Sequence, residues 1–204
     1  MSSINLLDED LYIWNEFRNG NADAFGKLIR THYQDLYNYG TRFTRDEELV
    51  KDCIQDLFLV LWTNRQTISE TSFVKYYLLK SLRRKLGEAV GRSRPFSSRY
   101  EPHFETFFSE VPAVETSIIR EEELTELTRK MRAILTGLSK RQQEVVYLRY
   151  YMDADVEEIA EIMGLNRQSV YNLLHDALKR LRKISQKENF FSKYSRYFSW
   201  LPLY

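Results

Sequence analysis

The sequence predicts an all-α protein built from two small helical domains joined by a linker. Apolar side chains recur at the 3.6-residue spacing of a helix along most of the chain, and no stretch alternates as a half-buried strand does. The 204 residues include only seven glycines and four prolines, so few positions break a helix. A hydrophobic content of 43% is enough to form a core in each domain.

The boundary between the two domains is expected where the prolines gather. Pro95, Pro102 and Pro112 are three of the four prolines, and serines and acids lie between them. Such a segment favours turns over helices. We therefore expect a helical bundle over residues 1–91, a linker over 92–117, a second helical domain over 118–186 and an aromatic C-terminal tail over 187–204.

Four helices are expected in the first domain, within residues 1–20 and over 22–44, 46–63 and 72–91. In the third of them, apolar pairs recur every four residues from Leu49 and Val50 to Leu61 and Trp62, which marks a deeply packed helix. The other residues expected to face the core are Leu11, Trp14, Phe17, Phe25, Leu28, Ile29, Leu36 and Phe43.

The second domain contains a pattern of two short helices joined by a tight turn. Ser139 and Gln142 have the spacing of a capping box at the start of the preceding helix. The next apolar stripe ends at Gly164, since glycine takes the left-handed C-cap conformation without steric cost. Asn166 then suits the N-cap of a further helix. This is a helix-turn-helix pattern, in which the start of the second helix enters the DNA major groove.

The polar face of that second helix carries side chains that suit DNA. Its members are Arg167, Gln168, Tyr171, Asn172, His175 and Lys179. Arginine can pair with guanine, and glutamine or asparagine can pair with adenine. A merely solvated face is the alternative, but a basic cluster against a single acid, Asp176, favours DNA. That cluster consists of Lys179, Arg180, Arg182, Lys183 and Lys187.

Charge is sorted along the chain although its sum is only +1. Residues 75–99 contain eight basic side chains and one acid, whereas residues 101–126 contain eight acids and one base. Basic blocks on a nearly neutral chain indicate local nucleic-acid contacts beside acidic surfaces that meet another partner.

The residues that would carry catalysis or bind a metal are missing or scattered. His32, His103 and His175 show no metal-ligand spacing with Cys53, and no glycine-rich phosphate loop occurs. Cys53 lies on an apolar stripe, where core packing is its expected role. We therefore expect no catalytic residue, no metal and no cofactor. The single cysteine, and the lack of a signal peptide or a long apolar run, favour a cytoplasmic protein without membrane insertion.

Stretches from both domains, in this order, resemble one protein family. "LSKRQQEVVYLRYYMDADVEEIAEIMGLNRQSVYNLLHDALKRLR" resembles the fourth region of bacterial alternative sigma factors of the extracytoplasmic-function group, and its "NRQSVYNLL" is similar to those of Bacteroidetes. "LVKDCIQDLFLVLWTNR" resembles the second region of that family. "FVKYYLLKSLRRKL" is similar to the segment that the family uses on promoter DNA.

The resemblance implies an alternative sigma factor, which binds core RNA polymerase and directs promoter-specific transcription initiation. Its second region would meet the clamp of the β′ subunit and the minus-ten element. Its fourth region would meet the β flap and the upstream minus-thirty-five element, which the polar face from Arg167 to Lys179 would read. Such proteins are not enzymes themselves.

For the polymerase, the resemblance indicates the face of the third helix opposite its core stripe. This face carries Glu48, Asp52, Gln55, Asp56 and Leu59, of which Asp52, Gln55 and Asp56 match the family's acid-glutamine-acid pattern. An apolar residue among exposed acids suits a partner helix with basic edges. A solvated face with one stray leucine is the alternative.

For the minus-ten element, the resemblance indicates the fourth helix of the first domain. Tyr77, Lys80, Arg83, Arg84 and Lys85 combine aromatic stacking with positive charge, as binding of single-stranded DNA requires. Tyr76 and Tyr77 are neighbours that cannot both point outward, so one of them belongs to the core. A flipped base would need the preceding loop, residues 64–72, as its pocket.

Two other functions stay open on the sequence. One is a conventional helix-turn-helix DNA-binding regulator whose first domain dimerises or senses a ligand. The other is an adaptor that captures partner helices without DNA. The aromatic tail is expected to dock on the chain itself, and the alternative is a site for an anti-sigma factor or for polymerase.

Overall fold

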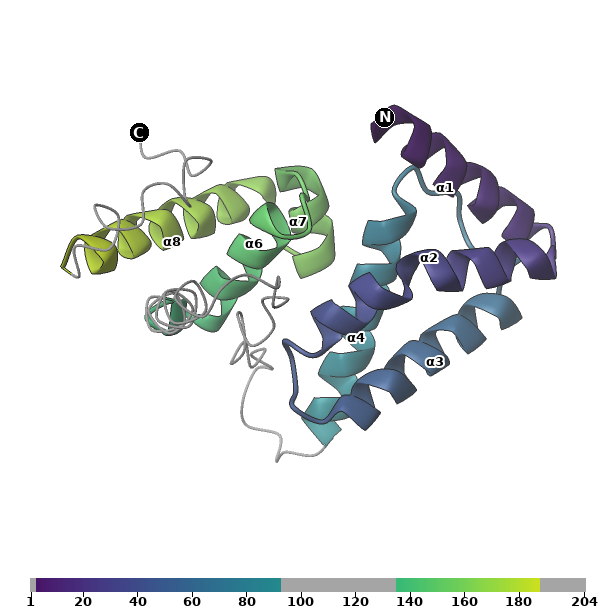
Figure 1. Ribbon diagram of the computed structural model, residues 1–204, viewed down its shortest axis with the longest axis horizontal. Coiled ribbons are helices and arrows are strands. Elements are labelled where there is room, and N and C mark those ends of the chain that lie inside the picture. The colour runs from purple at the N-terminus through teal and green to yellow at the C-terminus, as the bar shows by residue number, and fades with distance from the viewer. Residues whose placement is uncertain (1–2, 93–134, 188–204) are drawn as a thin grey trace, which may run out of the picture. The chain divides into compact units, whose positions relative to one another are not determined.

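The computed structural model describes residues 3–92 and 135–187, in which every regular element is an α-helix (Figure 1). The all-α fold is therefore confirmed for these residues. The helices are α1 Ser3–Arg18, α2 Ala22–Gly40, α3 Glu47–Thr63, α4 Val74–Arg92, α6 Lys140–Tyr150, α7 Val156–Met163 and α8 Arg167–Lys187.

These helices fall into two compact units. The first contains α1 to α4 and most of α7, and the second contains α6 and α8. Nearly all of the expected linker and of the aromatic tail lies outside the described residues. The domain boundaries proposed from the sequence therefore stay predictions.

Polar side chains fix where α2 and α3 begin. Asn21 accepts hydrogen bonds at its side-chain oxygen from the N–H groups of Asp23 and Ala24, at 3.0 and 3.1 Å. The Asp46 carboxylate accepts a bond from the N–H of Leu49 at 3.0 Å. Such caps satisfy N–H groups that have no partner within the helix. Asp46 is thus the N-cap of α3 and not, as expected from the sequence, its first residue.

Two other helices differ by a few residues from the approximate bounds that the sequence indicated. α2 stops at Gly40 and not at Thr44, because tighter bonds replace the helical ladder: Arg42 N–H bonds to the Tyr39 carbonyl, and Phe43 N–H to that of Gly40. This turn keeps Phe43 in the core, as predicted. α4 begins at Val74 and not at residue 72, after a local turn in which Thr71 Oγ1 accepts from Phe73 N–H.

An aromatic cluster forms the centre of the first unit. Trp14 and Phe17 of α1 are fully buried, and their ring centroids lie 5.4 Å apart. Phe25 of α2 stacks on Phe17 at 5.4 Å and lies 4.9 Å from Trp62 of α3. The cluster joins three helices whose inward residues were predicted from periodicity.

In the second unit, α6 starts with the predicted capping box. Ser139 Oγ accepts from the N–H of Gln142, and Gln142 Oε1 accepts from the N–H of Ser139. The neighbouring Gln143 is buried, and its amide donates to the carbonyls of Leu135 and Leu138 at 2.9 and 3.1 Å. These bonds tie α6 to the turn before it.

The turn after α7 is the one that the sequence predicted. Gly164 has φ +64°, in the left-handed region. Its N–H bonds to the Glu161 carbonyl, and the N–H of Leu165 bonds to the Ala160 carbonyl at 2.9 Å. This pair of bonds is the Schellman C-cap. Only three residues connect α7 to α8, as the helix-turn-helix pattern requires.

Gly40 provides a test of packing in the first unit. A methyl group at this position would lie 2.5 Å from Val50 Cγ1, so Gly40→Ala overpacks the contact between α2 and α3. We expect this change to lower the free energy of unfolding by about 1–3 kcal/mol. The matched control is Gly26→Ala in the same helix, where the added methyl meets only the flexible end of Arg30.

Gly26→Ala should instead raise the stability by about 0.5–1 kcal/mol, because alanine is the better helix former. Urea denaturation of the full chain, followed by circular dichroism, measures both changes. Equal stability of Gly40→Ala and the unmodified protein would contradict the tight packing at this position.

Candidate functional site

The start of α8 presents the polar face expected of a recognition helix. All six predicted DNA-contacting side chains lie on α8 and are exposed: Arg167, Gln168, Tyr171, Asn172, His175 and Lys179. Val170, Ala177 and Leu181, on the opposite side, are buried. Tyr171 is 55% exposed, which is unusual for a tyrosine that has only a packing role.

Two of these side chains are joined, which the sequence did not indicate. Gln168 Nε2 donates a hydrogen bond to Asn172 Oδ1 at 3.0 Å. The two residues are four apart and thus neighbours on the helix surface. The bond leaves the Gln168 oxygen and the Asn172 amide group free to pair with base edges. Together the two side chains therefore present one hydrogen-bond acceptor and one donor group to a base edge.

The outer face of α3 carries the second predicted site. Glu48, Asp52, Gln55, Asp56 and Leu59 are all exposed, whereas Val50, Cys53, Ile54 and Leu57 on the same helix are buried. Leu59 is 63% exposed and its neighbour Val60 is 46% exposed. Val60 was not named from the sequence, although its place outside the apolar pairs of α3 and next to Leu59 was the available signal. The exposed apolar area beside the acids is therefore larger than the sequence indicated.

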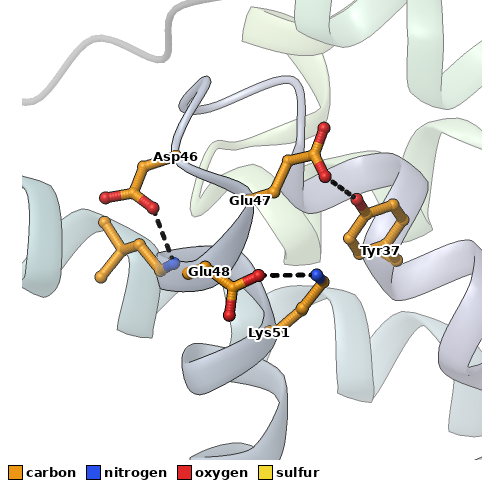
Figure 2. A network of polar contacts seen from close by, with 6 residues as sticks. Tyr37, Asp46, Glu47, Glu48 and Lys51 are labelled. Atoms are coloured by element: carbon orange, nitrogen blue, oxygen red, sulfur yellow. Dashed lines mark hydrogen bonds and ion pairs between the residues drawn. The ribbon is translucent and has the colours of Figure 1, made fainter.

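The first turn of α3 is held by a network of polar contacts (Figure 2). Lys51 Nζ lies 2.7 Å from Glu48 Oε1, and the Tyr37 hydroxyl donates to Glu47 Oε2 at 2.9 Å. The pKa of Tyr37 is raised above its usual value. The hydrogen bond to Glu47 is the largest cause, and burial of the hydroxyl is the second. This hydrogen bond connects α2 to α3. Asp52 and Asp56 lie further along the helix, beyond this network.

The basic residues of α4 are only partly available to a ligand. Lys80 and Arg84 are exposed, whereas Arg83 and Lys85 are half-buried. Lys85 Nζ lies 3.9 Å from Asp56 Oδ2, so a residue predicted to contact DNA pairs with one predicted to contact polymerase. The sequence did not reveal this pairing, because α3 and α4 meet only in the folded unit.

The aromatic residues of α4 lie as follows. Tyr77 is half-buried, with its ring 5.2 Å from that of Trp14 in an edge-on arrangement, so it packs on α1. Its proposed contact with DNA stays a prediction. Phe73, just before the helix, is 45% exposed, and its ring lies 6.1 Å from that of Tyr76. Phe73 was missed, and the signal for it is an aromatic residue at the junction of a polar loop and a helix.

The described residues bear on metal binding, thiol chemistry and membrane insertion. Within residues 3–92 and 135–187, no group of three His, Cys, Asp or Glu side chains is arranged to hold a metal ion. Cys53 is buried, and burial raises the pKa of its thiol, so the reactive thiolate is disfavoured. None of the helices in these ranges is long and apolar enough to cross a membrane.

Comparison with known proteins assigns both units to one family. Residues 28–94 match sigma-70 region 2, and residues 128–181 match sigma-70 region 4. These two matches together span more than half of the chain, in the order in which the family has them. The protein belongs to the sigma-70 family of transcription initiation factors. Within that family it is an alternative sigma factor of the extracytoplasmic-function group.

Proteins with a similar sequence include two sigma factors of Bacillus subtilis. The chain is 27% identical to the RNA polymerase sigma factor YlaC over 170 residues, which cover 80% of this chain and 92% of YlaC. It is 24% identical to the extracytoplasmic-function sigma factor SigX over 164 residues, 79% of this chain and 83% of SigX.

Two solved structures share the fold. One is CnrH in complex with the cytosolic domain of CnrY, with a TM-score of 0.59 at 20% identity, covering 87% of this chain and 97% of that one. The other is the sigma factor RpoE in complex with the anti-sigma factor NepR from Bartonella quintana. Its TM-score is 0.55 at 18% identity, with 79% of this chain and 96% of that one covered.

The joined amides of α8 generate a prediction about base reading. Gln168→Ala and Asn172→Ala should each cost about 1–3 kcal/mol of discrimination between the upstream element and scrambled DNA. The double variant should lose less than the sum of the two, because either single change already breaks their hydrogen bond.

The measurement is a double-mutant cycle with holoenzyme and competitor duplexes. Lys183→Ala on the same helix is the control, since it removes charge without a base-reading amide and should weaken binding to both duplexes equally. Strictly additive losses would show that Gln168 and Asn172 act independently.

Proposed function

We propose that this protein directs polymerase to its promoters through three faces: the outer face of α3 for core polymerase, the start of α8 for the upstream element and the outer face of α4 for the minus-ten element. The observation that carries the proposal is the exposed acidic and apolar surface on α3, in the same unit as a basic helix. One face binds protein while the other binds DNA.

The polymerase contact is argued from the composition of the α3 face. Leu59 and Val60 supply exposed apolar area, and Asp52 and Asp56 lie on the same helix. Interfaces commonly combine an apolar centre with a charged rim, and opposite charges on the partner speed and orient docking. A helix of the β′ clamp with basic edges suits this surface. The β flap is the corresponding partner of the second unit.

The DNA contacts are argued from the two helices with exposed basic residues. α8 offers Arg167 and the Gln168–Asn172 pair at its first turns, where a helix in the major groove reaches base edges. α4 offers the exposed cations Lys80 and Arg84, and the exposed ring of Phe73 directly precedes the helix. Aromatic rings and cations together hold single strands. Loop 64–72 precedes this ring and remains the proposed place for a flipped base.

Partners and location follow from this role. CnrH and RpoE were solved with CnrY and with an anti-sigma factor, and an anti-sigma factor is a proposed partner of this chain as well. The protein acts as an initiation factor and not as an enzyme, and it works in the cytoplasm, where polymerase is found. The motif "NRQSVYNLL" further supports an origin close to the sigma factors of Bacteroidetes.

Run-off transcription tests the proposal directly. Core polymerase with this protein should produce defined transcripts from promoters selected from genomic fragments, and core polymerase alone should not. The free protein should be a monomer. A free dimer that binds a palindromic site tightly, without stimulating run-off, would instead identify a conventional regulator.

The α3 face gives a prediction about polymerase binding. Leu59→Arg should weaken the affinity for core polymerase at least about tenfold, because an interfacial apolar centre rarely accepts a charge. Tyr12→Arg on α1 is the control, since Tyr12 is 67% exposed and lies outside the proposed interface.

The measurement is a competition against a labelled sigma factor for core polymerase. Circular dichroism should show unchanged helicity for both variants, because both positions are exposed. Equal affinities of the Leu59→Arg and Tyr12→Arg variants would remove α3 from the proposed interface.

A further inference from the structure

A basic groove lies in the second unit, between the start of α6 and the second half of α8. Its volume is about 600 Å³. α8 contributes the cations Lys179, Arg180 and Lys183 together with the half-buried Ile184. The turn before α6 contributes Gly137. The basic groove therefore combines positive charge with nonpolar surface.

The three cations of the basic groove have no partner among the described residues. None of them makes an ion pair or a hydrogen bond there, although Asp176 lies only four residues before Arg180 on the same helix. In the first unit, by contrast, Lys27 and Lys51 lie 2.6 and 2.7 Å from a glutamate. Like charges around a concave surface raise the local positive potential, which attracts acidic groups.

An acid-rich segment of the same chain has the complementary composition. Residues 101–117 contain four glutamates and no lysine or arginine, and their aromatic residues are Phe104, Phe107 and Phe108. The carboxylates suit the cations of the groove, and the rings suit its nonpolar surface. Residues 118–134 connect this segment to the start of the described part of the second unit, with a reach of at most about 60 Å. α8 is only about 30 Å long, so the connection is long enough.

Two other segments of the chain fit the groove less well. Residues 188–204 are aromatic but carry two bases against one acid, so their charge opposes that of the groove. Residues 121–126 are acidic but have no aromatic ring to cover Ile184. Charge and apolar surface together therefore favour residues 101–117.

We propose that residues 101–117 dock in the basic groove of the free protein and cover Lys179, one of the side chains predicted to contact DNA. A single exposed ion pair is weak, but several form together here, and the tether keeps the segment at a high local concentration. DNA phosphates compete for the same cations, so docking lowers the affinity of the free protein for DNA. Only this consequence for DNA rests on the proposed function, and the docking itself does not.

The first experiment is carbodiimide crosslinking of the full chain, which joins a lysine to a carboxylate in direct contact, followed by mass spectrometry of the peptides. Lys179 or Lys183 should be joined to a glutamate of residues 101–117. Glu9 and Lys27, which lie 2.6 Å apart, are a positive control within the same chain. In an equal mixture of isotopically light and heavy chains, each crosslink should contain one isotope only, because the segment docks on its own chain.

Three results of this experiment would overturn the proposal. The first is the absence of any crosslink between the groove lysines and residues 101–117 while Glu9 and Lys27 are joined. The second is a crosslink of the groove lysines to residues 121–126 in place of residues 101–117. The third is a set of crosslinks between light and heavy chains, which would identify a second copy as the occupant.

The second experiment measures binding of the free protein to random duplex DNA over a range of salt concentrations. One variant combines four changes within the segment: Glu101→Gln, Glu105→Gln, Glu110→Gln and Glu115→Gln. At about 0.1 M salt it should bind about tenfold more tightly than the unmodified protein. Its plot of log affinity against log salt should be steeper by about two to three, because three freed cations each displace about one counterion from DNA.

A matched control makes the same change in net charge outside the segment. It combines Glu121→Gln, Glu122→Gln, Glu123→Gln and Glu126→Gln, and its salt slope should stay within about one of the unmodified value. Circular dichroism confirms that both variants are folded. Equal effects of the two variants would overturn the proposal, since net charge alone would then explain them. Crosslinks to residues 101–117 without DNA binding by any variant would support the docking and contradict the proposed role of α8.

Discussion

The aromatic cluster around Trp14 is the contact on which the first unit depends. Trp14 is fully buried, and its ring meets Phe17 on its own helix and Tyr77 of α4 at 5.4 and 5.2 Å. Through Phe17 and Phe25 the cluster extends to Trp62 at the end of α3. Each such ring buries a large area and prefers a few relative orientations, so the cluster fixes the rotation of all four helices. The rotation of α3 and α4 in turn decides which side chains face outward.

Once these rotations are fixed, charges from different helices become neighbours. Lys85 of α4 lies beside Asp56 of α3, and Lys75 lies 2.8 Å from Asp35 of α2. Exposed ion pairs contribute about 1 kcal/mol or less, so a partner with a better-placed charge displaces them readily. The proposed acidic and basic faces therefore meet at the ion pair of Asp56 and Lys85.

Local bonds define where the helices of the helix-turn-helix begin and end. Gly164 and the two N–H bonds around it end α7, and α8 begins three residues later with the residues proposed to read DNA. The capping box of Ser139 and Gln142 fixes the start of α6 in the same way. The bonds that form the turn before α8 do not use the outward-facing side chains of its first turns. Those side chains therefore stay exposed.

The sequence alone determined the features that depend on neighbours along the chain. Helical periodicity predicted the all-α fold and the buried face of α3, and local chemistry predicted the Gly164 turn and the Ser139 capping box. The exposed side chains of α8 and α3 followed, because a helix has one buried face. The tertiary structure decided what depends on contacts across the chain. It placed Tyr77 against Trp14, paired Lys85 with Asp56 and brought Arg18 to Glu70, 52 residues apart. No local sequence pattern predicts these contacts between helices. They depend on how whole helices pack and not on the spacing of residues within a single helix.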